Sequence, residues 1–179
     1  MAKKTTFVVF INTLYTDIMN ILTKATSAKK PKTKESQNIA YMYAAILVIF
    51  ALAQLFTFEK FLVLLESFWF PGGKPVAYLL GSLIVVCEVM ALPFLLRLKL
   101  SPLMRITSMV LGWLVPIIWL FLTLWLLFTV NSVSNIGFLG TSVKLLPGWW
   151  AVFVCIAVGI LAIWASWGLW PCAKQKIKK

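Results

Sequence analysis

Residues 76–96 read VAYLLGSLIVVCEVMALPFLL, an apolar stretch in which Glu88 is the only charged residue. At about 1.5 Å per residue, an α-helix of this length crosses a hydrocarbon core of roughly 30 Å. Residues 38–58, 106–130 and 148–170 form further apolar stretches of spanning length, and none of them contains a charged residue. The sequence therefore predicts an all-α integral membrane protein, folded as a four-transmembrane-helix bundle.

The composition of the whole chain supports insertion into a bilayer. Of the 179 residues, 61% are hydrophobic and 12% are charged, and the mean hydropathy is +0.94. A soluble domain is about half apolar and about a quarter charged. The net charge of +12 does not indicate nucleic-acid binding, because the basic residues gather beside the predicted spans rather than on a folded polar surface.

The basic residues also predict an orientation. All Lys and Arg residues except Lys60, Lys74 and Lys144 fall within residues 1–37, 97–105 or 173–179. The positive-inside rule places these segments, and hence both termini, in the cytoplasm. We expect a cytoplasmic segment 1–37, a transmembrane domain 38–172 and a basic tail 173–179, located in the plasma (inner) membrane. The basic ends should attract anionic lipid headgroups.

Residues 5–23 are predicted to form an amphipathic helix at the cytoplasmic interface, followed by a polar, lysine-rich linker over Ala28–Gln37. Two alternatives are an inserted fifth span and a signal peptide. The polar face argues against the span, and the short apolar core without a small-residue cleavage site argues against the signal peptide. The apolar face repeats at three- and four-residue spacing through Phe7, Phe10, Ile11, Leu14, Ile18, Ile21 and Leu22.

The loop between the first two spans has its own apolar segment, Phe61–Phe70, which stops at Pro71. It predicts a short helix on the outer leaflet. We favour a lid that caps the bundle over a ligand-binding element. A joint cap with the loop 131–147 is an open alternative at this point. Small residues at helical spacing, including Gly81, Gly112 and Gly159, predict close helix packing rather than a substrate path.

Glu88 is the candidate functional residue. An ionised carboxylate at mid-membrane costs about 2.5–3.5 kcal/mol or more, and no intramembrane Lys or Arg is available to pair with it. We therefore expect Glu88 to face the bundle interior as a neutral acid. It is either a functional group or a structural one that hydrogen-bonds a neighbouring helix through Gln54, Thr123 or Ser166.

The residue inventory excludes several kinds of catalysis. The chain has no histidine, and Asp17 is its only aspartate, which removes His-dependent metal sites and Ser-His-Asp chemistry. Cys87, Cys155 and Cys172 form no CxxC pair. We predict no metal site, no cofactor and no catalytic residue.

The order of motifs resembles the DoxX-like superfamily, and within it the MauE (methylamine utilisation) branch. The likeness lies in Phe58–Phe61, in the glutamate-containing helix around Glu88, and in the loop Ile136-Gly137-Phe138-Leu139-Gly140 before the Trp149 pair. MauE-like proteins usually have Cys-Gly-Cys-Phe-Gly in that loop, and the matching positions Ile136 and Phe138 are not cysteines. The resemblance implies a four-span fold and a link to thiol redox support of exported proteins.

Three functions remain open at this point, and the aromatic content of 15% also permits a fourth, lipid or quinone binding between the helices. The first is a non-catalytic accessory or scaffold subunit with a membrane protein partner or a homo-oligomer. The second is a proton-coupled small-molecule transporter that uses Glu88. The third is a thiol-redox membrane protein of the MauE type, which the missing cysteine pair disfavours. The sequence favours the non-catalytic role over an enzyme.

Overall fold

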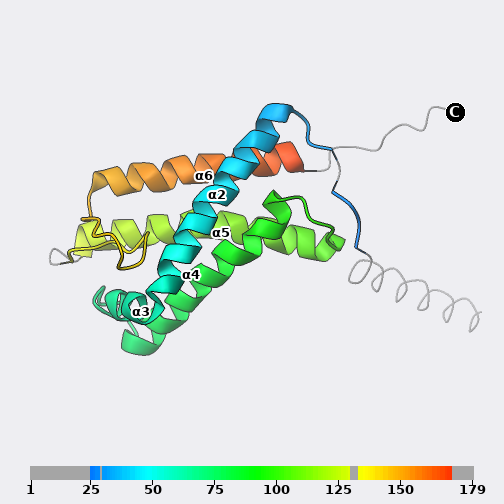
Figure 1. Ribbon diagram of the computed structural model, residues 1–179. Coiled ribbons are helices and arrows are strands. Elements are labelled where there is room, and N and C mark those ends of the chain that lie inside the picture. The colour runs from blue at the N-terminus through cyan, green and yellow to red at the C-terminus, as the bar shows by residue number, and fades with distance from the viewer. Residues whose placement is uncertain (1–24, 29, 130–132, 171–179) are drawn as a thin grey trace, which may run out of the picture.

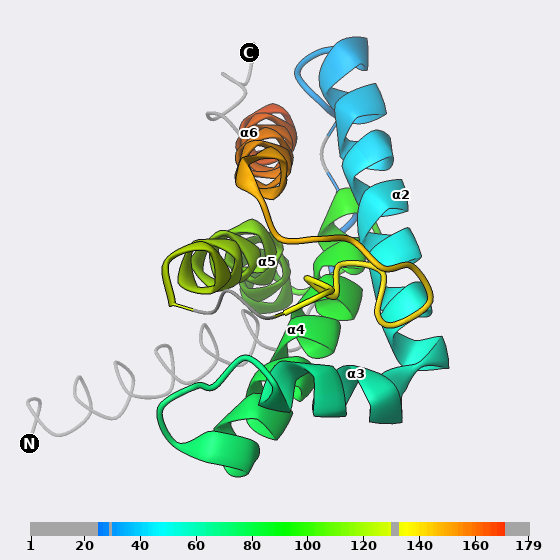
Figure 2. The ribbon, with the colours of Figure 1, turned by 90° about the vertical axis from the view of Figure 1, so that its left-hand side faces the viewer.

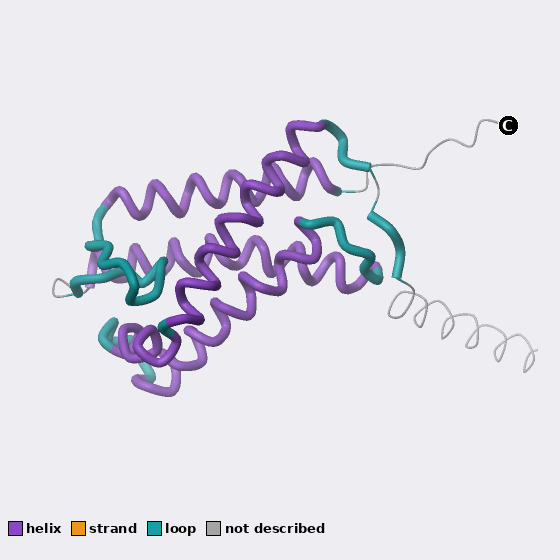
Figure 3. The backbone as a smooth tube through the Cα atoms, viewed as in Figure 1, coloured by secondary structure: helices purple, strands orange, loops and turns teal. Residues whose placement is uncertain are grey.

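The computed structural model describes residues 25–28, 30–129 and 133–170. The predicted amphipathic helix 5–23, the tail 173–179 and Cys172 lie outside these residues. The described chain is helical, and Figure 3 shows the loops that join the helices. The helices in chain order are α2 (Lys34–Phe56), α3 (Phe58–Glu66), α4 (Gly73–Leu95), α5 (Pro102–Thr129) and α6 (Trp149–Leu169).

Four of these helices, α2, α4, α5 and α6, are long and apolar enough to cross a membrane. The prediction of a multi-pass helical membrane protein is therefore confirmed. The helix that contains the first predicted span begins before that span, because α2 starts at Lys34, inside the predicted linker. Thr33 caps this helix, since its hydroxyl accepts a hydrogen bond from the Ser36 amide at 3.1 Å. The Ser36 hydroxyl in turn accepts from the Thr33 amide at 3.4 Å, which completes a capping box.

The spanning helices form a closed ring. Helix α2 packs against α4 and α6, and α5 packs against the same two helices from the other side. Figures 1 and 2 show α2 crossing obliquely over the bundle. The terminus end holds residues 25–33, the loop 96–101 and Trp170. The loop end, on the opposite side of the bundle, holds α3 and the loop 133–148.

Buried aromatic and aliphatic side chains fill the centre of the ring. Tyr43, Leu47, Ile84, Trp119 and Leu122 are all almost fully enclosed. The outward faces are equally apolar, which suits a surface that faces hydrocarbon rather than water. Sequence amphipathicity is therefore a weak guide to the inward face of these helices.

The glycines differ in how tightly they are packed. A Cβ at Gly81 would lie 2.7 and 2.8 Å from terminal methyl groups of Leu62 and Leu65, so these side chains would have to shift to make room for it. A Cβ at Gly112 would meet Ala91 at 3.4 Å, a tight contact. Gly159 is different, because its nearest neighbour would be Pro116 at 3.8 Å, an ordinary contact.

A proline near the end of α4 is accommodated by the next helix. Pro93 lacks an amide hydrogen and disturbs the last turn of α4. Ser108 of α5 compensates, because its hydroxyl accepts from the Phe94 amide at 3.1 Å and donates to the Met90 carbonyl at 2.6 Å. Satisfying such backbone groups from a neighbouring helix is what makes proline tolerable within a membrane span.

The short helix predicted over Phe61–Phe70 is present as α3, but it begins three residues earlier, at Phe58. Its Phe61 and Leu65 side chains are buried against the bundle. The loop 133–148 lies against α3, because a Cβ on Gly137 would come within 3.2 Å of the Leu64 side chain. The Thr141 amide also donates to the hydroxyl of Thr57, the residue before α3, at 3.1 Å. The joint cap that the sequence only suggested is therefore a feature of the structure.

Candidate functional site

Glu88 lies in the buried stripe of α4. Ile84 and Ala91, one turn away on either side, are fully buried on the same face of the helix. The side chain of Glu88 has no solvent exposure. The carboxyl group thus faces the bundle interior, as the cost of exposing a carboxyl group to lipid predicted.

Three side chains and one backbone carbonyl, from four different segments, meet at this point. Gln54 of α2 donates from Nε2 to Glu88 Oε1 at 3.1 Å and to the Phe138 carbonyl at 3.2 Å. Trp119 of α5 donates from Nε1 to the same Glu88 oxygen at 3.3 Å. These bonds join α2, α4, α5 and the loop 133–148 into one polar cluster, hereafter the Glu88 cluster.

Two polar atoms of the Glu88 cluster have no hydrogen-bond partner among the described residues. They are Glu88 Oε2 and Gln54 Oε1, and both side chains are fully buried. A neutral carboxyl group carries a hydroxyl donor, whereas the amide oxygen is an acceptor. Such unpaired buried atoms are uncommon in native structures, and they make this the chemically unusual point of the bundle.

Aromatic rings enclose the Glu88 cluster on the side of the loop. The Phe138 ring meets Trp119 edge-on with centroids 4.8 Å apart, and it stacks on Phe50 at 5.8 Å. Trp119 also lies against Phe61 of α3, with centroids 6.5 Å apart. These rings separate the carboxyl group from the loop end and keep its surroundings apolar.

Asn135 organises the loop that carries Phe138. Its Oδ1 accepts from the amides of Gly137 and Leu145, both at 3.1 Å, and its Nδ2 donates to the Gly140 carbonyl at 3.1 Å. Gly137 and Gly140 adopt φ angles of +92° and +59°, which glycine tolerates best. Of the predicted motif 136–140, Ile136 and Phe138 are buried, and they hold the loop against the bundle.

Of the three residues expected to bond with Glu88, only Gln54 does so in the structure. Gln54 is a direct partner, whereas Thr123 and Ser166 form their hydrogen bonds elsewhere. Thr123 donates to the Leu120 carbonyl of its own helix, and Ser166 donates to that of Ala162. Each of these hydroxyl hydrogens is therefore used within its own helix, and neither hydroxyl bonds to Glu88.

Two members of the Glu88 cluster were missed at the sequence level. Trp119 was absent from the prediction, although a mid-span tryptophan needs an acceptor for its indole N–H. The Phe138 carbonyl is a backbone group, so the residue type at this position does not indicate its role. Asn135 could have been suspected from its position two residues before Gly137, which suits a side-chain-stabilised turn.

A second feature is an open apolar groove between α5 and α6, with a volume of about 430 Å³. Cys155, Gly159 and Ala162 are its small lining residues on α6. At one end the Trp113 indole donates to the Ser166 hydroxyl at 2.7 Å, which ties the two helices together. Exposed Ile117 and Ile163 form its rims, so the groove opens onto the outer surface of the bundle.

Two of the cysteines lie in the described part of the chain: Cys155 lines the groove, and Cys87 directly precedes Glu88. Cys87 and Cys155 are free and buried, on α4 and α6. Among the described residues, no group of three or more His, Cys, Asp or Glu side chains could hold a metal ion.

Comparisons with protein-family models, curated proteins and solved structures find no match to this chain. The Glu88 cluster and the groove are therefore the features of the chain that bear on its function. The likeness to DoxX and MauE proteins stays a prediction from sequence motifs.

Proposed function

We propose that this chain is a non-catalytic accessory or scaffold subunit of a membrane complex, with both termini in the cytoplasm. The observation that carries the proposal is the groove between α5 and α6. Its walls are almost wholly apolar, its rims are exposed, and small side chains line its α6 side. Small residues let a second helix backbone approach closely, which is the main way in which helices associate in lipid.

Gly159 supplies the specific support. The chain's own packing does not require a glycine there, because a Cβ would make only an ordinary contact with Pro116. A mid-helix glycine costs roughly 0.5–1 kcal/mol relative to alanine. A partner helix that packs in the groove would require a small residue at position 159, whereas the isolated bundle does not.

The test is crosslinking and pull-down from native membranes with a tag at the C-terminus, comparing the wild type with Gly159→Leu. Ala157→Leu is the matched control, because it adds a similar bulk at an exposed position of α6 that does not line the groove. We expect the wild type and Ala157→Leu to retain a stoichiometric partner and Gly159→Leu to lose it. An equal yield from all three chains would remove the groove as the docking surface, and no partner at all would remove the proposal.

A second candidate is proton-coupled transport of a small molecule through Glu88. The two unpaired atoms Glu88 Oε2 and Gln54 Oε1 favour it, because a buried acid that lacks a full set of partners is poised to bind or release a proton. The test is flux into proteoliposomes under a pH gradient, with Glu88→Gln as the variant. If the wild type shows flux that depends on pH and the variant does not, transport through Glu88 is supported. Unchanged flux in the variant excludes Glu88 as the coupling group.

A further inference from the structure

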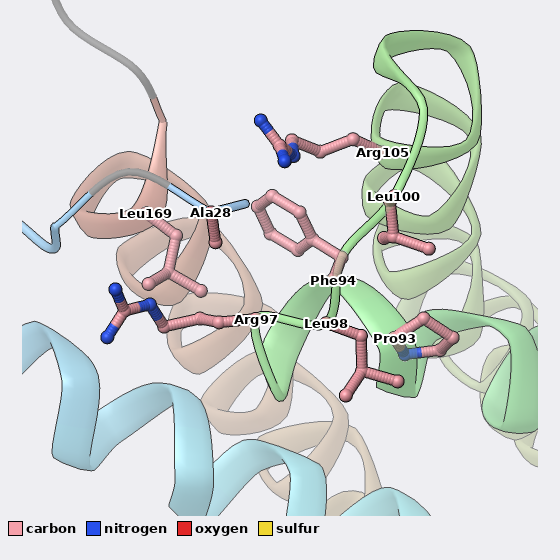
Figure 4. A pocket seen from close by; sticks show the side chains of 8 residues that line it. All are labelled: Ala28, Pro93, Phe94, Arg97, Leu98, Leu100, Arg105 and Leu169. Carbon is pink, nitrogen blue, oxygen red and sulfur yellow. The ribbon is translucent and has the colours of Figure 1, made fainter. Parts of the chain in front are cut away.

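A basic pocket lies at the terminus end of the bundle, away from both features described above. Figure 4 shows Arg97 and Arg105 on either side of Phe94, with Leu169 of α6 opposite. Ala28 and Leu100 also line the pocket. Five parts of the chain therefore build it: the linker before α2, the end of α4, the α4–α5 loop, the start of α5 and the end of α6.

The backbone around the pocket is held by defined contacts. Thr26 and Leu100 exchange backbone hydrogen bonds of 3.0 and 3.3 Å. The Arg105 guanidinium donates to the Thr26 carbonyl at 2.9 Å, which secures the linker across the loop. The Lys32 amide donates to the Gly168 carbonyl at 3.1 Å and ties the same linker to α6. These hydrogen bonds hold in place the backbone segments that carry both arginine side chains.

Arg97 occupies an unusual backbone position. It follows the C-terminus of α4 with a φ of +57°, in the left-handed region where glycine or asparagine is the cheaper residue. Its amide bonds to the Phe94 carbonyl at 3.1 Å, so the turn is well formed. The sequence therefore has a guanidinium group at a helix end where backbone preference alone would select a smaller residue.

The electrostatic surroundings of the pocket are strongly positive. Lys30, Lys34 and Lys99 are exposed at the same end, and Lys32 lies 4.2 Å above the ring of Trp167. Glu35 is the only acidic side chain among the described residues of this end. Such a field concentrates anions, and an arginine fork matches the oxygens of a phosphate group.

We propose that this pocket binds the phosphate group of an anionic phospholipid in the leaflet at the terminus end. Arg97 and Arg105 face the phosphate, and the partly exposed side chains of Leu100 and Leu169 lie against the start of the acyl chains. The enclosed space is about 10 Å³, roughly that of one water molecule, so the phosphate binds at the rim, where both arginines are partly exposed. The apolar walls favour a lipid over a soluble phosphate ion.

The test uses the full-length protein in a neutral detergent and native mass spectrometry. The protein is titrated with dioleoyl phosphatidylglycerol and, separately, with dioleoyl phosphatidylcholine. We expect one phosphatidylglycerol to bind saturably and more tightly than phosphatidylcholine. The double variant Arg97→Gln/Arg105→Gln should weaken that first binding event by about tenfold or more, at about 1 kcal/mol for each basic residue.

The matched control is Lys30→Gln/Lys99→Gln, which removes the same charge from exposed lysines of the same end that do not line the pocket. It should weaken the first binding event clearly less than Arg97→Gln/Arg105→Gln does, because these exposed lysines contribute only to the diffuse field. An equal loss of affinity for phosphatidylglycerol in both double variants would show that the lipid responds only to the overall positive charge. That result would overturn the proposed binding site. Displacement of the lipid by millimolar inorganic phosphate would overturn the lipid assignment in favour of a soluble ion.

Since Arg105 also braces the linker, the double variant could lose affinity through unfolding. Arg97→Gln alone resolves this, provided that its unfolding temperature matches the wild type. Under that condition, a loss of about threefold or more supports the site, and unchanged affinity contradicts it.

Discussion

Gly168 of α6 lies directly against Ser36 of α2, so closely that a methyl group on Gly168 would overlap the serine side chain. Ser36 is fully buried and belongs to the capping box that starts α2. The contact therefore joins the end of one span to the beginning of another. Gly168 was not among the glycines expected to pack helices, whereas Gly159, which was, has space around it.

Gly168→Ala should destabilise the fold, because relieving the overlap requires α2 and α6 to move apart. We expect a loss of about 1–3 kcal/mol, in line with other overpacked sites. Gly159→Ala is the control and should be neutral or stabilising by up to about 1 kcal/mol, since alanine is the better helix former. Thermal unfolding of both variants in the same detergent measures the difference, and equal unfolding temperatures would contradict the packing argument.

The Gln54–Glu88 hydrogen bond should couple α2 to α4 energetically. Replacing Glu88 with leucine leaves the indole N–H of Trp119 and one amide hydrogen of Gln54 unpaired, at a cost of about 1–3 kcal/mol. Glu88→Gln keeps an acceptor oxygen and should cost less. A double-mutant cycle with Gln54→Leu should give a coupling energy of about 0.6–1.7 kcal/mol. Strict additivity would show that the two side chains do not interact.

Asn135→Ala should loosen the loop end without unfolding the spans. The change removes three hydrogen bonds that hold the loop 135–145 together. Lys144 is exposed in this loop, so trypsin reports on its opening. We expect faster cleavage after Lys144 in Asn135→Ala than in the wild type or in Ser142→Ala, a substitution at an exposed position of the same loop. Equal cleavage rates would assign the loop's order to other contacts.

The predicted orientation can be tested by labelling engineered cysteines. In a Cys172→Ser background, Lys144→Cys and Ser27→Cys place exposed thiols at the loop end and the terminus end, while Cys87 and Cys155 are buried. The positive-inside rule predicts that a membrane-impermeant maleimide labels Lys144→Cys on intact cells and labels Ser27→Cys only after lysis. The reverse pattern would place both termini outside.

Hydropathy and length determined the architecture without any knowledge of contacts. Each span is an apolar run of 20 or so residues, as a bilayer requires, and that property is local to the run. The same local logic predicted the short helix after α2 and placed Glu88 in the bundle interior. Boundaries were less certain, because the start of α2 depends on the Thr33 capping box and not on hydropathy.

The tertiary structure alone decided which groups meet. Glu88 has Trp119 and Gln54 as partners rather than Thr123 and Ser166, because the rotation of each apolar helix about its axis is set by packing against its neighbours. Side chains that are apolar on every face give no sequence signal for that rotation. The hydrogen bond from Gln54 to the Phe138 carbonyl and the Gly168–Ser36 contact likewise cannot be predicted from the sequence. Each of them joins residues that are more than 80 positions apart.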